Sequence, residues 1–279
     1  MLDKKITCLI LSCDQYSDLW DGNVTLFNRN WPQRPFETYL VTDKPSTLSL
    51  SGVKIMVAGF SEWSERLAYA LHLVETEYVF ITLDDYFLIR PVDNNHMEGI
   101  IELMDKRGYD YMRFYPRPKS ATRHKISGSL NLYEVDTMCG YSVNLYSSIW
   151  KTDFLQYCVR DPLSAWQFEV ALSDLATDYH AKCMCSNGND FEILDVVRKG
   201  KILHKADRYF KKNPDIYSGD RPVHTWGYEL KLWVVTMIGR YAPAFIRPLL
   251  QGIYVRCGGI SYQYLDRKKK KRMEGSMEK

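Results

Sequence analysis

Two adjacent carboxylates, Asp84 and Asp85, follow an apolar run of strand-forming residues at 78–83. Such a continuous apolar run is typical of a strand that is buried on both faces of a parallel sheet. Ligands of open α/β sheets bind outside the carboxyl ends of the strands, which is where these two acids lie. A carboxylate pair there attracts a hard divalent cation such as Mg²⁺ or Mn²⁺, which can neutralise a diphosphate. The pair therefore predicts metal-assisted diphosphate chemistry; the alternative is that it only caps the turn after the strand.

Alternating strand and helix patterns over the first half of the chain must position this pair. The strand patterns occur at 6–12, 36–42, 53–57 and 78–83. A helix-compatible stretch at 14–30 follows the first strand, and apolar residues at steps of three or four predict a further helix between Ser61 and Val74. Strands separated by helices predict right-handed crossovers and a mostly parallel sheet. We therefore predict an α/β domain over 1–210, followed by a helical, basic extension over 211–279.

A polar and basic segment at 116–129 contains glycine and follows a strand-like stretch at 109–115. Segments of this composition usually run over the surface of a protein and are more mobile than its core. We expect 116–129 to be a mobile loop that closes over a bound ligand and excludes water.

Composition indicates a globular protein of the cytoplasm. With 279 residues, 46% of them hydrophobic, the chain can bury one large core, with or without a small appendage. Its seven cysteines are odd in number and scattered, which favours reduced thiols over a disulfide framework or a zinc site. The first residues show no signal-peptide pattern, so we expect the protein to stay in the cytoplasm.

The basic excess of the chain is confined to its C-terminal tail. Residues 266–279 carry seven lysines and arginines against three acids, whereas the preceding residues carry 30 basic and 31 acidic groups. An aromatic and aliphatic stretch at 232–264 comes before the tail, but its prolines and arginines keep every apolar run short of the roughly 20 residues that a spanning helix needs. We expect 232–272 to bind the anionic inner face of a cell membrane peripherally. A solvated tail is the alternative, and the near-neutral body argues against nucleic acid as a partner.

Five short motifs occur in a fixed order along the chain. They are SCDQYSDLW (12–20), NWP (30–32), WSERL (63–67), LDDYF (83–87) and WQFE (166–169). Together they resemble bacterial nucleotide-sugar glycosyltransferases of the GT-A fold, which build capsular and other surface polysaccharides. The resemblance covers 5–205 and implies a Rossmann-like sheet flanked by helices, a divalent metal, and a UDP-sugar donor. One departure is that the acids are adjacent, whereas the usual GT-A signature is Asp-x-Asp.

The resemblance implies roles for the acids and for a cation near the strand ends. Side chains alternate across a strand, so both acids can face one ion only if the backbone turns between them. We assign Asp85 as the metal ligand and Asp84 to the ribose or a metal-bound water, and the reverse assignment stays open. Asp14 and Asp43 are expected at the nucleotide base and ribose, with turn formation as the alternative. Arg66 is expected at the diphosphate or donor sugar, with a surface ion pair as the alternative.

The last motif supplies a candidate catalytic base. Trp166 and Glu169 are three residues apart on a helical pattern and so share a face. An aromatic ring is a platform for a sugar, and in the resembling enzymes an acid at this place takes the proton of the attacking hydroxyl. We assign Trp166 to the acceptor and Glu169 as base. The alternative is that Trp166 is a core residue and Glu169 stabilises the first turn of its helix.

A basic turn further along the chain offers the remaining ligands. GT-A enzymes often close the donor site with a C-terminal segment that gives a histidine to the metal and cations to the phosphates. By position, Lys201 is our candidate for the phosphates and His204 for the metal, with His224 a weaker second choice. A hydrogen-bonded structural role is the alternative for His204.

These assignments describe a metal-assisted glycosyltransferase of the hexosyltransferase class. The donor is a nucleotide diphosphate-sugar, the acceptor a lipid-linked glycan of surface polysaccharide synthesis, and the reaction inverting with Glu169 as base. Three alternatives remain: a retaining glycosyltransferase, a sugar nucleotidyltransferase, and a catalytically silent GT-A-like scaffold at the membrane. The nucleotidyltransferase alternative lacks support because no glycine-rich loop follows the first strand.

Overall fold

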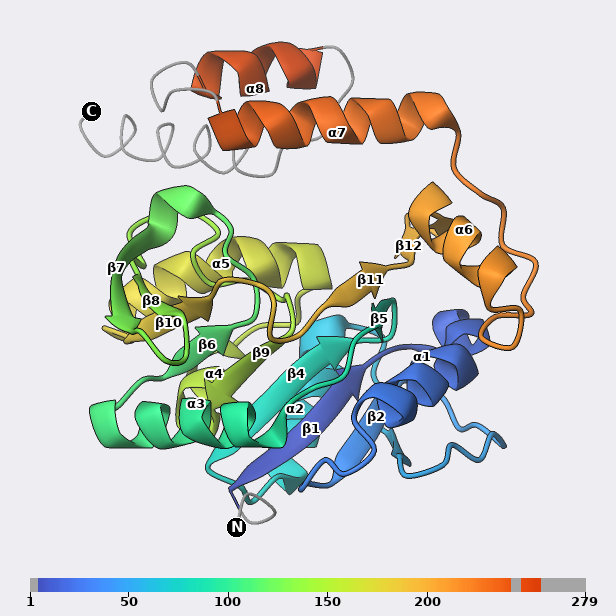
Figure 1. Ribbon diagram of the computed structural model, residues 1–279, viewed down its shortest axis with the longest axis horizontal. Helices are drawn as coiled ribbons and strands as arrows, with labels where there is room; N and C mark the ends of the chain where they lie inside the picture. The colour runs from blue at the N-terminus through green and yellow to red at the C-terminus, as the bar shows by residue number, and fades with distance from the viewer. Residues whose placement is uncertain (1–4, 242–246, 257–279) are drawn as a thin grey trace. The chain divides into compact units, whose positions relative to one another are not determined.

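The computed structural model describes residues 5–241 and 247–256 (Figure 1). Contacts divide the chain into two compact units, Met1–His224 and Thr225–Lys279. The boundary between them falls after the one expected at 210, because the segment up to His224 packs with the first unit.

A nine-stranded mixed sheet forms the centre of the described part of the first unit. In spatial order its strands are β3 (Lys54–Val57), β2 (Thr38–Thr42), β1 (Ile6–Leu11), β4 (Tyr78–Leu83), β9 (Ser148–Lys151), β6 (Tyr111–Arg113), β10 (Cys183–Ser186), β8 (Leu132–Val135) and β7 (Thr122–Ser127). Only β9 and β8 run opposite to the other seven. The predicted α/β class, with a mostly parallel, Rossmann-like sheet of the kind expected for a GT-A enzyme, is confirmed.

Helices cover both faces of the sheet because its strands are apolar on both sides. α1 (Ser17–Asn30) and α3 (Asn94–Arg107) pack on the face to which Cys8 and Ile10 of β1 point. α2 (Trp63–Leu73), α4 (Thr152–Cys158) and α5 (Ala165–Asp178) pack on the face to which Leu9 and Leu11 point. Each large apolar side chain buried in these layers contributes about 1.5–3 kcal/mol. Two-sided burial is the reason that β1 and β4 read as continuous apolar runs.

A further layer of short elements lies over the carboxyl ends of the central strands. It contains β5 (Tyr86–Leu88), β11 (Ile193–Asp195), β12 (Val197–Arg198), β13 (Lys201–Ile202) and α6 (His204–Lys212). β11 pairs with β5 and β12 with β13, both antiparallel. These elements share an apolar cluster with α1 that reaches Phe210 and Ile216. The close approach depends on Gly22 of α1, where any Cβ would collide with the carbonyl oxygen of Ile216.

The second unit is helical over most of its described residues. It contains α7 (Trp226–Tyr241) and α8 (Arg247–Arg256). Within the described ranges, no helix has the length and apolar character needed to cross a membrane. The basic cluster at 267–272 and much of the aromatic stretch before it lie outside the described residues.

The expectation of a mobile loop at 116–129 is wrong. This segment contains the short 3₁₀ helix η3 (Lys119–Ala121) and then β7, which pairs with β8 at the edge of the sheet. The middle of β7 is charged and exposed, with Arg123, His124 and Lys125 in succession. Charged side chains are common on edge strands because they oppose pairing with other chains. The polarity that indicated a loop therefore reflects the edge position of a strand.

Candidate functional site

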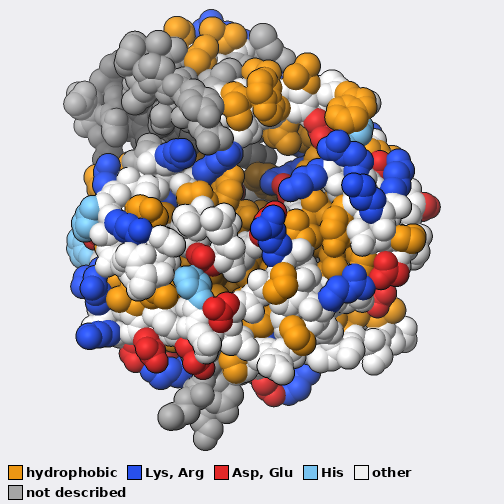
Figure 2. All heavy atoms as spheres, in the orientation of Figure 1, with side chains coloured by type: hydrophobic (Ala, Val, Ile, Leu, Met, Phe, Trp, Pro, Cys, Tyr) orange, Lys and Arg blue, Asp and Glu red, His pale blue; other side chains and the backbone are white. Residues whose placement is uncertain are grey.

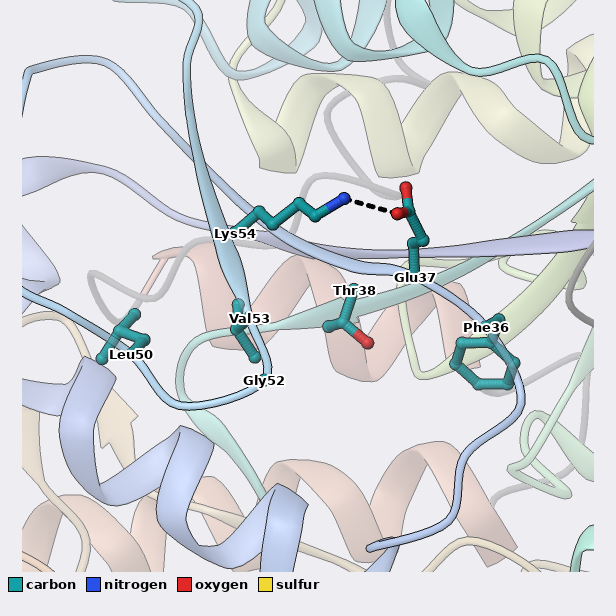
Figure 3. Close-up of a pocket in the computed structure, with 7 residues that line it drawn as sticks. All are labelled: Phe36, Glu37, Thr38, Leu50, Gly52, Val53 and Lys54. Carbon is teal, nitrogen blue, oxygen red and sulfur yellow. Dashed lines mark hydrogen bonds and ion pairs between the residues drawn. The ribbon is translucent and has the colours of Figure 1, made fainter.

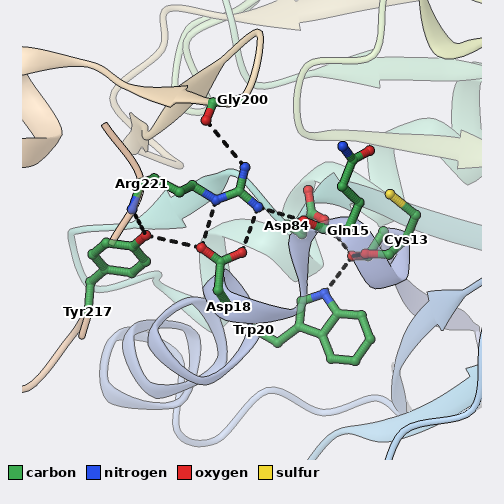
Figure 4. Close-up of polar contacts among 9 residues, drawn as sticks. Cys13, Gln15, Asp18, Trp20, Asp84, Gly200, Tyr217 and Arg221 are labelled. Atoms are coloured by element: carbon green, nitrogen blue, oxygen red, sulfur yellow. Dashed lines mark hydrogen bonds and ion pairs between the residues drawn. The ribbon is translucent and has the colours of Figure 1, made fainter. Parts of the chain in front are cut away.

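The carboxylate pair lies where the sequence predicts it, in the turn between β4 and β5. Asp84 is 7% exposed, and its carboxylate accepts a hydrogen bond from the Ser12 hydroxyl. Ser12 follows β1 directly, next to β4, and its hydroxyl oxygen accepts in turn from Nε1 of Trp20 at 2.6 Å. Trp20 and Asp84 are drawn in Figure 4. The first motif, 12–20, thus supports one of the two acids through a buried relay.

The backbone does turn between the two acids, as the shared-ion hypothesis requires. The side-chain amide nitrogen of Asn23, on α1, donates to the carbonyl oxygens of Asp84 and Tyr86, both at 3.1 Å. On the other side, the amide of Val196 donates to the carbonyl oxygen of Asp85 at 2.9 Å. The turn is therefore held from α1 and from the layer that contains β11.

Both carboxylates are unfavourably placed for carrying charge without a cation. Burial raises the pKa of Asp84 to about 7, against the opposing effect of the Ser12 hydrogen bond. Burial raises the pKa of Asp85 well above its ordinary value, and the charges of Asp84 and Asp195 raise it further. Oδ1 of Asp85 is buried, with no hydrogen-bond partner among the described residues. A buried, unpartnered carboxylate oxygen beside other acids is well suited to ligating a cation.

The two carboxylates suit a divalent ion whose remaining ligands are water and substrate oxygens. Among the described residues, no three His, Cys, Asp or Glu side chains come together as a metal ligand set. His204, the first residue of α6, therefore does not complete one with the two acids. Mg²⁺ is commonly held by one or two carboxylates, with the rest of its shell made of water and substrate phosphate oxygens. Asp84 and Asp85 suit that kind of site, and a closed site made only of protein ligands is excluded for the described part.

Arg198 of β12 pairs with Asp195, whose charge contributes to the raised pKa of Asp85. Its Nε and Nη2 atoms donate to Oδ2 of Asp195 at 3.0 and 2.6 Å. Burial raises the pKa of Asp85 and of Glu169, and the charge of Arg198 opposes that rise in both. Lys201, which we predicted to bind the phosphates, belongs to the same basic turn. It is exposed and lies on the other strand of the hairpin, β13. The signal for Arg198 was the acid three residues before it.

Glu169 lies on α5 and belongs to the same electrostatic neighbourhood as Asp85. Its Oε1 accepts a hydrogen bond from the amide of Leu145 at 3.2 Å. Burial raises the pKa of Glu169, and both the Leu145 hydrogen bond and the charge of Arg198 oppose that rise. A carboxylate with a raised pKa is a better proton acceptor at neutral pH. The charge of Arg198 thus acts on both the predicted base and the predicted metal ligand.

Trp166 lies one turn before Glu169, on the first turn of α5. Ser164 caps this helix with a reciprocal hydrogen-bond pair to Gln167, which fixes where the helix begins. Trp166 is 50% exposed, which excludes the alternative that it is a core residue. Its assignment to the acceptor stays a prediction.

The ends of β1 and β2 bring together the other predicted donor-site residues. The amide of Asp14 donates to Oδ1 of Asp43 at 2.6 Å, and Lys44 pairs with Asp14 at 3.1 Å. Nη1 of Arg66 donates to the carbonyl oxygens of Phe60 and Ser61 at 3.1 and 2.5 Å. The charge of Arg66 lowers the pKa of Asp43 and counteracts the raised pKa of Asp84. Four predicted donor-site residues are thus linked by a hydrogen bond or by charge: Asp14, Asp43, Arg66 and Asp84.

Arg221 is a second functional candidate that the sequence analysis missed. Its guanidinium donates to both carboxylate oxygens of Asp18, each at 2.6 Å, and to the carbonyl oxygen of Gln15 at 2.6 Å (Figure 4). It lies over the ring of Tyr16 at 4.6 Å, and its charge counteracts the raised pKa of Asp84. Arg221 follows α6 in a turn-rich segment without a motif. Only the fold places it against the first motif.

Two surface hollows lie away from this site. They share Phe36 and Gly52 and are lined otherwise by residues of 28–38 and 50–54, at the amino ends of β2 and β3. In one of them, Lys54 and Glu37 pair with each other (Figure 3). Ligands of α/β sheets bind at the carboxyl ends, so the acidic cluster, and not these hollows, is the candidate site.

Comparisons with known proteins leave the family open. No family model matches the chain, and no curated protein matches it. Similar solved structures include S. aureus TarS 1-349 in complex with UDP, at 12% identity and a TM-score of 0.45, over 67% of this chain and 59% of that one. They also include UDP-glucose pyrophosphorylase complexed with UDP-glucose, at 11% identity and a TM-score of 0.41, over 68% of this chain and 92% of that one.

A third similar structure is the bifunctional IspDF from Campylobacter jejuni, at 13% identity and a TM-score of 0.41, over 68% of this chain. The chain spans 52% of the length of that protein. Similarity at this level assigns neither a family nor an activity to this chain.

Proposed function

We propose that this protein is a metal-assisted glycosyltransferase that moves a sugar from a UDP-sugar to a glycan acceptor in surface polysaccharide synthesis. The observation that carries the proposal is the buried Asp84–Asp85 turn with its unpartnered carboxylate oxygen at the carboxyl edge of the sheet. A further acid on α5, Glu169, supports the proposal because burial raises its pKa and the charge of Arg198 opposes that rise.

The donor side of the reaction uses the ends of β1, β2 and β4. Asp14 and Asp43 hold the nucleotide base and ribose, and Arg66 supports the diphosphate from α2. Asp85, with Asp84, holds Mg²⁺ or Mn²⁺. When bound, the ion neutralises the charge that develops on the leaving diphosphate. Arg198 adds a second positive charge, which opposes the burial-driven rise in the pKa of Asp85.

The acceptor side uses α5. An acceptor hydroxyl rests beside Trp166 and loses its proton to a carboxylate oxygen of Glu169. Its oxygen forms the new bond to the anomeric carbon while the bond from that carbon to the diphosphate oxygen breaks. The electron pair leaves with the nucleoside diphosphate, so the configuration at the anomeric carbon inverts.

The acceptor is lipid-linked in this proposal, and the C-terminal region brings the enzyme to the inner face of the membrane. Trp226, Leu230 and Trp233 of α7 are spaced four and three residues apart and are 66%, 61% and 58% exposed. Exposed tryptophans on one helix face, followed by the basic cluster at 267–272, suit an interfacial helix.

The test is calorimetric titration of the purified protein with UDP, GDP and TDP, with and without Mn²⁺. We expect one nucleotide, UDP, to bind in a metal-dependent way, and Asp85→Asn to lose that dependence. Asp178→Asn, which removes an exposed carboxylate at the end of α5, is the matched control and should bind as the wild type does. If no nucleoside diphosphate binds under either condition, the proposal fails and the silent-scaffold reading replaces it.

A further inference from the structure

A basic patch lies around α6 in the described first unit. Between 199 and 212 the chain has six lysines and arginines and one acid. We call these six exposed residues the α6 basic face: Lys199, Lys201, Lys205, Arg208, Lys211 and Lys212. Figure 2 shows lysine and arginine side chains gathered over α6. Because residues 1–265 as a whole carry one more acid than base, this excess is local.

The helix is built so that its cations point away from the protein. At 3.6 residues per turn, the four cations of α6 from Lys205 to Lys212 fall within about 120° of the helix circumference. The buried residues Ala206 and Phe210 lie on the opposite side and pack into the cluster shared with α1. Only one pairing, that of Lys211 with Asp207 at 2.8 Å, is made by these cations with an acid of the described chain. The stripe is thus exposed and largely uncompensated.

The α6 basic face is continuous with the candidate site. The hairpin of β12 and β13 carries Arg198, which pairs with Asp195 of β11, and α6 begins directly after the second strand of the hairpin and contacts β11. The hairpin turn adds Lys199 and Lys201 beside the helix. A flat anionic surface that contacted α6 would therefore lie beside the acids that we assign to catalysis.

We propose that the α6 basic face docks on the anionic headgroups of a lipid bilayer and orients the site toward an acceptor carried in that bilayer. Lysine and arginine near such a surface are attracted by its negative potential within about one Debye length. Because the cations form an extended stripe on a packed helix, more of them can contact a flat anionic surface at once than can contact a single small anion. The orienting role rests on the proposed function, whereas the docking does not.

The experiment is sedimentation of the full chain with vesicles of phosphatidylcholine, alone or with 30% phosphatidylglycerol, at low and high salt. The test variant combines Arg208→Gln, Lys211→Gln and Lys212→Gln. Each lost cation weakens binding roughly fivefold, so we expect a partition coefficient about 100-fold lower on anionic vesicles. Binding to phosphatidylcholine alone should not depend on these residues.

Two controls separate the face from net charge and from misfolding. Lys106→Gln, Lys125→Gln and Lys182→Gln remove three exposed lysines from elsewhere on the first unit and should leave vesicle binding within about twofold. Arg208→Lys, Lys211→Arg and Lys212→Arg keep the charges and should also keep the binding.

The proposal is overturned if the Gln variant of α6 binds anionic vesicles as tightly as the wild type, because the C-terminal tail would then account for the attraction. It is also overturned if the two Gln variants lose binding equally, or if the wild type does not bind. Metal-dependent UDP binding, measured on the same samples, reports on the proposed function separately.

Discussion

Replacement of Glu169 by glutamine tests the proposed base with little disturbance of the structure. The carboxylate accepts a hydrogen bond from the amide of Leu145, and the carbonyl oxygen of a glutamine can accept the same hydrogen bond. The variant therefore loses the proton acceptor but keeps the shape of the side chain. General base catalysis contributes about 10²–10⁴-fold, so we expect kcat to fall by that factor, or about 2.7–5.4 kcal/mol in the barrier.

The pH dependence of kcat is a second, independent test of Glu169 as the base. Burial raises the pKa of Glu169 above its ordinary value. In the wild type, log kcat should therefore rise with pH until that raised pKa is passed, and Glu169→Gln should lack this limb. The stability effect has the opposite direction: an acid with a raised folded-state pKa makes the fold less stable as pH rises from the unfolded to the folded pKa. At neutral pH we therefore expect Glu169→Gln to melt no lower than the wild type.

The assay is transfer of a radiolabelled sugar to acceptor, with UDP binding measured by calorimetry on the same preparation. Glu102→Gln, on the exposed side of α3, is the control for losing one glutamate. Unchanged kcat in Glu169→Gln would remove this residue from the mechanism and favour a retaining reaction, which product anomericity would then establish. Lost UDP binding would instead show that Glu169 supports the donor site.

Three further predictions follow from the acidic cluster and the tail. Because burial raises the pKa of Asp84 to about 7, metal-dependent UDP binding should strengthen as pH rises through that value, since protons and the metal compete for the carboxylates; a flat calorimetric profile between pH 6 and 8 would contradict this. Arg198→Gln removes two charged hydrogen bonds to Asp195 from a partly exposed pair, so we expect a loss of about 1–2 kcal/mol in urea unfolding and weaker UDP binding; wild-type affinity would show that Arg198 is only structural. Deletion of 267–279 should reduce sedimentation with anionic vesicles and leave UDP binding intact, and equal sedimentation would show that the tail does not contribute.

Local pattern was sufficient for the central strands and the acidic pair. The apolar run at 78–83 predicts a strand that is buried on both faces, as observed. Asp84 and Asp85 then lie at its carboxyl end. The same reasoning failed at 116–129, where charge and glycine indicated a loop. An edge strand makes half of its backbone hydrogen bonds and exposes much of its surface, so its sequence resembles that of a loop.

The partners of the acids could not be read from local pattern. Ser12, Asn23 and Arg221 contact the turn or its neighbours from segments that are far from it in sequence. Their side chains are of kinds that are common on any surface. The boundary between the two units, after His224, was not predicted for the same reason. The segment after α6 is turn-rich, yet it packs against α1 through Ile216.

By itself, the amino-acid sequence determined the α/β class, the place of Asp84 and Asp85 at a strand end, and the helix that carries Glu169, because these depend on side-chain periodicity and on residues close together in the chain. Only the tertiary structure decided that Arg198 pairs with Asp195, that the charges of Asp195 and Arg221 act on the acidic pair, and that the cations of α6 form one exposed stripe. Long-range electrostatic contacts arise when packing brings distant strands together and removes water between them. A linear sequence records the charges but not the burial that gives them their effect.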